Sequence, residues 1–411
     1  MTGGAAVSVG AAGGEAGSGA ADGAAGSGAG AVFDRLTGQD QVIEQLRAAA
    51  ESNRPTHAWL FTGPPGSGRS VAARAFAAAL LCDRHGCGEC PSCHQVAAGS
   101  HADLLLVRPD GISYGVKQTR ELVLRAAASP VYGGWRVVLF EDADRATEQA
   151  ANALLKAIEE PPPRTIWLLC SPSAADLPIT IRSRCRLVTL RTPPTAAVAD
   201  ILRRDGVDAE RAAEAARASL GHIGRARRLA TDPEAAARRA EVLAVPARLT
   251  GVGEALAAAA SLVDSAKSEA AAITQALDGP ERDALRQAFG EGSTGKGVAS
   301  AVRGAAGALK DLEARQKSRA TRIERDALDL ALLDLAAFYR DVLAVQFDAE
   351  VELANSAQQA DLRAIAGSSS PRDTVRKLEA IMICRTRLAA SVAPLLAVEE
   401  LTLTLAGAIP E

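Results

Sequence analysis

The feature that most constrains the fold is a short apolar run followed by a glycine-rich loop and an alanine-rich helix. HAWLF (57–61) predicts a strand, TGPPGSGRS (62–70) a tight loop, and SVAARAFAAALL (70–81) a helix. Backbone N–H groups at the start of such a helix can cradle phosphate oxygens. The pattern therefore predicts an α/β nucleotide-binding fold.

Further apolar runs alternate with helical stretches after this helix. They are DLLLV (103–107), WRVVLF (135–140), TIWLLC (165–170) and RLVTL (186–190). Continuous apolar runs separated by helices indicate parallel strands that are buried on both faces. We therefore expect a five-stranded parallel sheet.

The 411 residues have room for two or three domains. Residues 1–31 are almost all Ala, Gly and Ser and cannot offset their ordering entropy, so they predict a disordered tail. We expect the sheet domain at 32–192, a small helical lid domain at 193–238 and a helical collar domain at 239–411. One apolar stripe in the last part has helical spacing, which is typical of a bundle core. Its members are Leu328, Leu332, Leu335, Tyr339 and Val342.

Composition excludes several classes of protein. The tail has neither a basic start nor a run of large apolar residues, which predicts no signal peptide and no membrane span. We therefore expect a cytoplasmic protein. The net charge of −3 gives no global basic field, so any contact with nucleic acid would have to be local.

The glycine-rich loop nearly matches the phosphate-binding pattern G-x-x-x-x-G-K-[ST]. Gly63, Gly66 and Gly68 permit the tight path, and Ser70 would hold Mg²⁺. Arg69 stands where a lysine normally reaches the β- and γ-phosphates, and a planar, forked guanidinium does not replace a compact ammonium. The loop predicts a phosphate-binding fold, with nucleotide binding and hydrolysis left open.

The second element of an ATPase site is also altered. Such a site has four apolar residues and then Asp-Glu, in which Asp organises Mg²⁺ and Glu polarises the attacking water. Here VVLF is followed by Glu141 and Asp142, in the inverted order. Catalytic geometry tolerates a misplacement of about 1 Å poorly, so we expect little hydrolysis. A second match to the phosphate-binding pattern G-x-x-x-x-G-K-[ST] occurs at GEGSTGKG (290–297). It follows a helical stretch and ends in glycine instead of Ser or Thr, so we interpret it as an interhelical loop.

Four of the seven cysteines lie close together, at Cys82, Cys87, Cys90 and Cys93. Structural Zn²⁺ takes four tetrahedral thiolates, and glycines and a proline between these residues would let the chain wrap around an ion. The spacing therefore predicts a structural zinc site. A reduced cysteine-rich loop and disulfides are the alternatives, and a reducing cytosol disfavours the latter.

The other three cysteines and the two histidines beside the cluster are not predicted to bind metal. His85 and His94 flank the cluster, but four thiolates leave no ligand position for them. Cys170, Cys185 and Cys384 are interpreted as small buried residues.

Together these motifs resemble the AAA+ clamp-loader family of bacterial DNA polymerase III. A zinc knuckle directly after the first helix of the AAA+ domain is typical of that family. The resemblance covers residues 32–230 closely and the remaining helical part in outline. The other stretches that carry it are FDRLTGQDQVIEQL (33–46), the segment 115–165, LPITIRSRCRLVTL (177–190) and LGHIGRARRLA (220–230).

The resemblance also implies roles for individual residues. Motor subunits keep the loop lysine and the Asp-Glu order, which this chain lacks, whereas Ser183, Arg184 and Cys185 match the family's Ser-Arg-Cys signature. It implies that Arg184 enters the ATP site of a neighbouring motor subunit, where such an arginine can be worth 10³–10⁵ in rate; a structural salt bridge is the alternative. In motor subunits a sensor arginine touches the chain's own ATP. The register here puts Gly224 at that position, with Arg225 one residue later.

We therefore expect a stator subunit in a ring of five that has little ATPase activity of its own. The resemblance implies tau/gamma-type ATPase subunits, a delta subunit, the sliding clamp and primed DNA as partners, at the bacterial replication machinery. Two alternatives stay open: an active tau/gamma-type ATPase in which Arg69 substitutes for lysine, and a zinc-dependent DNA-binding module. ATP hydrolysis by the purified chain would support the first, and a salt-dependent affinity for DNA the second.

Overall fold

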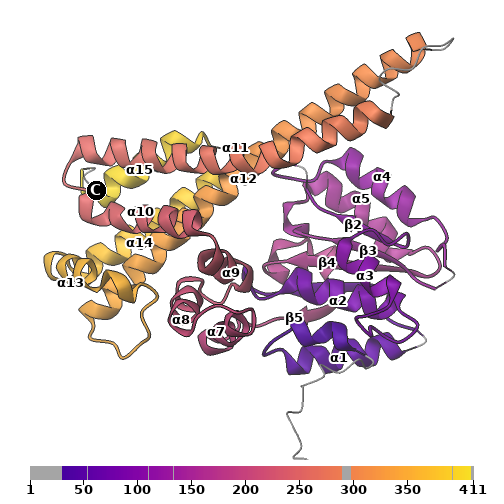
Figure 1. Ribbon diagram of the computed structural model, residues 1–411, viewed down its shortest axis with the longest axis horizontal. Helices are drawn as coiled ribbons and strands as arrows, with labels where there is room; N and C mark the ends of the chain where they lie inside the picture. The colour runs from indigo at the N-terminus through magenta and orange to yellow at the C-terminus, as the bar shows by residue number, and fades with distance from the viewer. Residues whose placement is uncertain are drawn as a thin grey trace, which may run out of the picture.

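The computed structural model describes residues 30–288 and 298–408, apart from residues 53, 110, 133 and 391. A sheet unit, a small helical unit and a C-terminal bundle follow one another along the chain, and a helical hairpin projects from the bundle (Figure 1). The interhelical loop expected at 290–297 and all but the last two residues of the expected tail lie outside the described residues. Within the described chain, no helix is long and apolar enough to span a bilayer.

Five parallel strands form one sheet in the order β2-β3-β4-β1-β5. The strands are β1 (Ala58–Thr62), β2 (Leu104–Val107), β3 (Arg136–Phe140), β4 (Thr165–Ser171) and β5 (Arg186–Thr189). Each agrees with its predicted apolar run to within one residue at either end. The expected parallel sheet is therefore confirmed.

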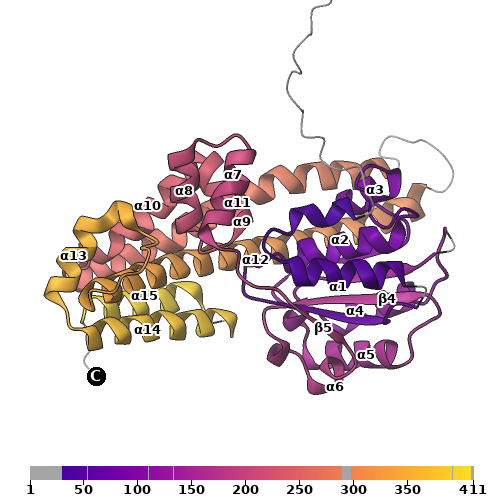
Figure 2. The same cartoon turned by 90° about the horizontal axis from the view of Figure 1, so that it is seen from below.

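Helices pack on both faces of this sheet, which explains the continuous apolar runs. They are α1 (Asp40–Glu51), α2 (Arg69–Leu81), α3 (Pro91–Ala98), α4 (Val116–Ala126), α5 (Glu148–Glu159) and the single turn α6 (Ile179–Arg182). Successive strand residues point to opposite faces. In β1, Trp59 and Phe61 share a core with α1, α2 and α3, whereas Ala58 and Leu60 share the other core with α4, α5 and α6 (Figure 2).

The strand β5 differs from its neighbours because it lies at the edge of the sheet. It pairs with β1 on one side. Arg186, Leu187 and Thr189 are exposed, and Val188 is buried. The segment that precedes β5 therefore reaches the surface of the sheet unit.

The small helical unit contains three short helices with an alanine-rich core. They are α7 (Thr195–Arg204), α8 (Ala209–Ala218) and α9 (Ile223–Thr231). Val198 and Leu202 pack there against alanines of α8 and α9, including Ala212 and Ala226. Small side chains allow these helices to approach closely, so a compact unit forms from few residues.

The C-terminal bundle consists of six helices among the described residues. They are α10 (Pro233–Arg248), α11 (Val252–Ala288), α12 (Val298–Gln346), α13 (Gln359–Ser368), α14 (Pro371–Ala389) and α15 (Pro394–Leu405). Every member of the predicted stripe from Leu328 to Val342 is buried in its core, which confirms that prediction. The far ends of α11 and α12 extend beyond the bundle as the projecting hairpin (Figure 1).

Candidate functional site

The glycine-rich loop connects β1 to α2 and has a tight, left-handed path. The φ angles of Gly66 and Gly68 are 87° and 90°. A Cβ atom on residue 66 would lie 2.4 Å from the Cβ atom of His222, so only glycine allows this approach. The N–H of Ser67 donates to the carbonyl of Pro64 at 3.0 Å and closes the turn. The small helical unit therefore contacts the glycine-rich loop directly.

The loop retains buried polar atoms that could contact a ligand. Gly63 donates its N–H to the carbonyl of Pro172 at 3.1 Å, and Arg69 and Ser70 begin α2, both half-buried. The Oγ atom of Ser67 and the Nη1 atom of Arg69 are buried and have no hydrogen-bond partner among the described residues. Buried polar atoms normally have one, so a bound anion or a water molecule would satisfy them. The residues present thus fit a phosphate group.

His222 is the residue of the small helical unit that faces this loop, and sequence reasoning did not identify it. It is the N-cap of α9, and its Nδ1 atom accepts the N–H of Arg225 at 3.2 Å. Burial lowers the pKa of His222, and the charges of Arg225 and Arg69 lower it further. The neutral imidazole that results can act as an acceptor. Its place before a helix was visible in the sequence, but the contact with the loop was not.

The inverted carboxylate pair follows β3, and the carboxylate of Glu141 forms ion pairs with two arginines of the same chain. Its two oxygens are bound by Arg74 Nη2 at 2.8 Å and by Arg108 Nε at 2.7 Å, and the residue is 9% exposed. Asp142 follows with a left-handed φ of 49°. A magnesium ion bound at Glu141 would have to displace charge-assisted hydrogen bonds from two guanidinium groups.

The sequence contained a partial signal for this ion-pair network. Arg74 lies four residues after Ser70, on the same face of α2, so it must point toward the phosphate site. Arg108 directly follows the edge strand β2, where nothing in the local pattern indicates that its partner is Glu141, the residue after β3.

Arg184 lies between α6 and β5, at the edge of the sheet. Its Nη1 atom donates to the carbonyl of Thr180 at 2.8 Å and to Ser183 Oγ at 3.3 Å, and its Nη2 atom is 2.7 Å from Glu159 Oε1. The side chain is 39% exposed. The residues that hold Arg184 lie outside the glycine-rich loop, and its guanidinium reaches the surface.

Arg225, one residue after Gly224, reaches the C-terminal bundle instead of the phosphate loop. Its Nη2 atom pairs with Asp334 of α12, and Arg239 of α10 donates from Nε to the same carboxylate at 2.9 Å. The side chains of Arg225, Arg239 and Asp334 are 10%, 12% and 6% exposed. Arg225 therefore joins the small helical unit to the bundle. Sequence reasoning missed Asp334 because it is distant along the chain.

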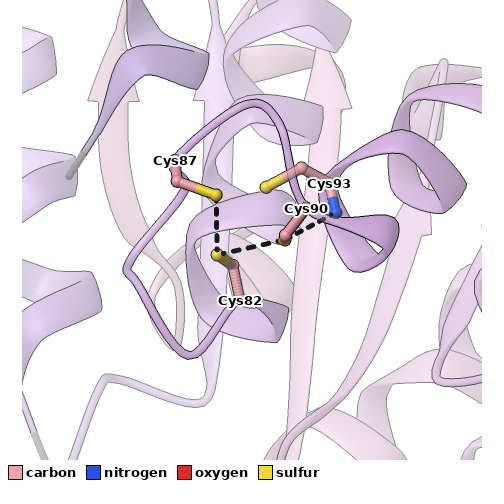
Figure 3. Close-up of side chains that lie close together, drawn as sticks. All are labelled: Cys82, Cys87, Cys90 and Cys93. Atoms are coloured by element: carbon pink, nitrogen blue, oxygen red, sulfur yellow. Dashed lines mark hydrogen bonds between the residues drawn. The ribbon is translucent and has the colours of Figure 1, made fainter. Parts of the chain in front are cut away.

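The four clustered cysteines converge on one point, after α2 and at the start of α3 (Figure 3). Their Sγ atoms all lie within 4.8 Å of one another. The Sγ atom of Cys82 is 3.7 Å from that of Cys87 and 3.5 Å from that of Cys90. Four thiolates bound to Zn²⁺ at about 2.3 Å in a tetrahedron would lie ~3.8 Å apart. The geometry therefore fits a four-cysteine metal site, completed by Cys93.

The local backbone explains how this knuckle closes. Gly86 has a φ of 86°, and a Cβ atom there would lie 2.6 Å from Cγ2 of Val32. The N–H of Val32 donates to the carbonyl of Gly86 at 3.1 Å, so the 3-10 turn η1 (Ala31–Arg35) docks on the knuckle. Pro91 begins α3, where the N-cap Cys90 accepts the N–H of Cys93 at 3.4 Å.

The pKa values of two thiols in the knuckle are shifted in opposite directions. The backbone N–H of Glu89, donated to the thiolate, is the main reason why the pKa of Cys87 is lowered to about 6. Burial instead raises the pKa of Cys93. A divalent cation would hold all four groups as thiolates. The ligand cluster found among the described residues consists of the four cysteines alone, without His85 or His94.

The three isolated cysteines were all predicted to be buried. Cys170 and Cys384 are buried, but Cys185 is only partly so. The prediction is wrong for Cys185 because it immediately precedes the exposed edge strand β5.

Comparison with known proteins identifies relatives of the sheet unit. Residues 38–194 match the family model described as "DNA polymerase III, delta subunit". A segment of 154 residues is 40% identical to DNA polymerase III subunit delta' of Pseudomonas aeruginosa and covers 36% of this chain and 47% of that protein. A segment of 179 residues is 35% identical to DNA polymerase III subunit gamma/tau of Mycobacterium tuberculosis and covers 42% and 31% of the two proteins.

Residues 38–194 are therefore similar to subunits of DNA polymerase III that carry the names delta' and gamma/tau. The matched segment spans less than half the length of both relatives, and the names delta' and gamma/tau both occur among the matches. Among solved structures, a DNA polymerase III gamma subunit-related protein of Thermotoga maritima aligns with a TM-score of 0.40 at 17% identity, covering 90% of this chain and 99% of that one. The sheet unit has the five parallel strands, and the glycine-rich loop between β1 and α2, that the sequence predicts for an AAA+ domain.

Proposed function

We propose that this chain is a clamp-loader subunit of DNA polymerase III and that it is of the delta-prime type. In this role it is a stator in a ring with tau/gamma-type ATPase subunits and a delta subunit. The ring loads the sliding clamp onto primed DNA at the replication machinery of the bacterial cytoplasm. The similarity to the delta' subunit of Pseudomonas aeruginosa supports this assignment.

The state of the chain's own nucleotide site carries the proposal. Glu141 occupies the position of the magnesium-organising aspartate, and it is bound on both oxygens by Arg74 and Arg108. Arg225, next to the sensor position, is engaged with Asp334. Together with Arg69 in place of the lysine, these contacts engage the carboxylate at the magnesium position and the arginine next to the sensor position, which disfavours hydrolysis by this chain.

The residue proposed to serve catalysis is Arg184, acting on a neighbouring subunit. Its guanidinium is exposed at the sheet edge and carries a planar fork suited to phosphate oxygens. Placed beside a neighbour's γ-phosphate, it would neutralise charge that develops during hydrolysis.

The four-cysteine knuckle is proposed to hold one structural Zn²⁺. Cys82, Cys87, Cys90 and Cys93 would fill all four positions, so the ion would have no open site for chemistry. Its role would be to fasten the segment between α2 and α3, and with it the docked turn η1, to the sheet unit.

A tau/gamma-type motor is the second candidate. The glycines of the loop and the unpartnered polar atoms of Ser67 and Arg69 favour a retained nucleotide site. The match to the gamma/tau subunit of Mycobacterium tuberculosis also supports it. A turnover of about 1 s⁻¹ or more in the isolated chain would decide for this motor.

Substitution of Arg184 in a reconstituted loader tests the stator proposal. Arg184→Ala should leave the isolated chain folded but reduce DNA-stimulated ATP hydrolysis and clamp loading, because one site of the ring would lose its trans arginine. Arg184→Lys should rescue poorly, since a point charge does not reproduce the fork. Arg182→Ala, two residues earlier, is the matched control with a milder expected effect. Unchanged loading by an assembled ring that contains Arg184→Ala would refute the proposal.

A further inference from the structure

In the free chain, both terminal nitrogens of Arg184 are held by the chain itself. Nη1 donates to the carbonyl of Thr180 and to Ser183 Oγ, while Nη2 lies 2.7 Å from a carboxylate oxygen of Glu159. Glu159 is the last residue of α5, so its side chain projects from the C-terminal end of that helix. The guanidinium is thus drawn back against α5 and α6.

This arrangement competes with phosphate recognition. A guanidinium binds phosphate most strongly through two parallel N–H groups. One of the nitrogens that could form such a pair, Nη2, is already bound to an anion. Full engagement of a γ-phosphate by Arg184 therefore requires that the Glu159 carboxylate be exchanged for phosphate oxygens.

The pair is suited to such an exchange because it is accessible to solvent. The side chains of Arg184 and Glu159 are 39% and 38% exposed. Exposed ion pairs contribute little net stability, so a more highly charged anion can displace the carboxylate at small cost. Arg225 and Asp334 provide a contrast in the same chain, since their ion pair is almost completely buried.

We propose that Glu159 is a positioning residue that holds Arg184 in a retracted state until the triphosphate of a neighbouring subunit replaces it. This inference rests on the proposed trans role of Arg184. It assigns to Glu159 the function of a competing anion, which reduces engagement of the arginine when no triphosphate is present. A purely structural salt bridge at the end of α5 would instead contribute only to folding.

Neutralising the carboxylate separates these two roles. In the reconstituted loader with clamp and primed DNA, Glu159→Gln should raise kcat/KM for ATP by about two- to fivefold, the range that an exposed pair can supply. Glu160→Gln is the matched control, because Glu160 is the next residue and is also exposed, whereas the carboxylate that pairs with Arg184 is that of Glu159. This control should leave kcat/KM unchanged.

A double-substitution cycle connects the effect to Arg184. In an Arg184→Ala background, Glu159→Gln should have no effect on kcat/KM, because the carboxylate of Glu159 then has no guanidinium at position 184 to bind. If Glu159→Gln leaves kcat/KM unchanged or lowers it while Arg184→Ala still reduces it, the inference on Glu159 is wrong and the stator proposal stands. If Arg184→Ala itself has no effect, the proposed function fails first.

Discussion

Replacement of Asp334 by alanine should loosen the small helical unit from the C-terminal bundle. Asp334 of α12 is the common partner of Arg225 in α9 and Arg239 in α10. Its removal would leave two guanidinium groups that are only 10% and 12% exposed without their carboxylate. A buried charge that has lost its partner is costly, because it is neither hydrated nor neutralised.

The expected magnitude follows from this burial. Breaking a buried ion pair by removal of one partner costs about 3–5 kcal/mol. Arg239 also donates to the side chain of Asn355 and keeps that contact, so we expect a value near the lower limit, about 3 kcal/mol. At 1.36 kcal/mol for each factor of ten, the opening equilibrium of α9 should increase by about two orders of magnitude.

Hydrogen exchange of the backbone amides of α9 measures this opening directly. The matched control is Asp329→Ala on the same helix, where the partner Arg385 and the aspartate are 24% and 41% exposed, so we expect about 1 kcal/mol or less. If the protection of α9 in Asp334→Ala equals that of this control, the ion-pair network does not fasten the unit and the reasoning is wrong.

Three other predictions concern the knuckle, the glycine-rich loop and His222, which faces that loop. A Cys90→Ser/Cys93→Ser variant should lose its zinc, measured by elemental analysis, and full retention of one ion per chain would contradict the assignment. Arg69→Lys should leave hydrolysis by the isolated chain far below about 1 s⁻¹, because Glu141 stays bound to its arginines; motor-like turnover in a steady-state ATPase assay would overturn this. His222 has a pKa below its ordinary 6.5, so below that pH the unfolded chain takes up a proton that the folded chain resists, and stability should fall. His222→Asn, which can still cap α9, should therefore weaken the drop in melting temperature between about pH 7 and about pH 5; an unchanged drop would show that this histidine is not responsible.

The sheet could be predicted almost completely from the sequence because its signals are local. Each strand is centred on an apolar run, and β1, β3 and β4 are buried at every position, with polar residues only at their ends. The helical stripe from Leu328 to Val342 was visible for the same reason, since it recurs with the helical period. The partial exposure of Cys185 was not visible, because an edge position depends on the order of strands rather than on their composition.

The candidate site was predictable in its residue types but not in its partnerships. The loop, the inverted carboxylates and the four cysteines are contiguous motifs, so the sequence alone identified them. The contacts of Glu141 with Arg108, of Arg225 with Asp334 and of Gly66 with His222 join segments far apart in the chain. No local spacing encodes these pairings, since the first forms only when β2 and β3 pair in the sheet and the other two form only when separate units pack together.

The exposed edge strand β5 also bears on how the chain behaves when it is produced without partners. An open strand edge is a template for pairing with another chain, and Leu187 presents a half-exposed apolar side chain there. The brevity of β5 and the basic residues Arg182, Arg184 and Arg186 around its start act as gatekeepers against self-association. Substitution of Arg184 by alanine removes one of these gatekeepers. Purified variants should therefore be matched for monodispersity by light scattering before their activities are compared, so that aggregation is not mistaken for a lost catalytic contact.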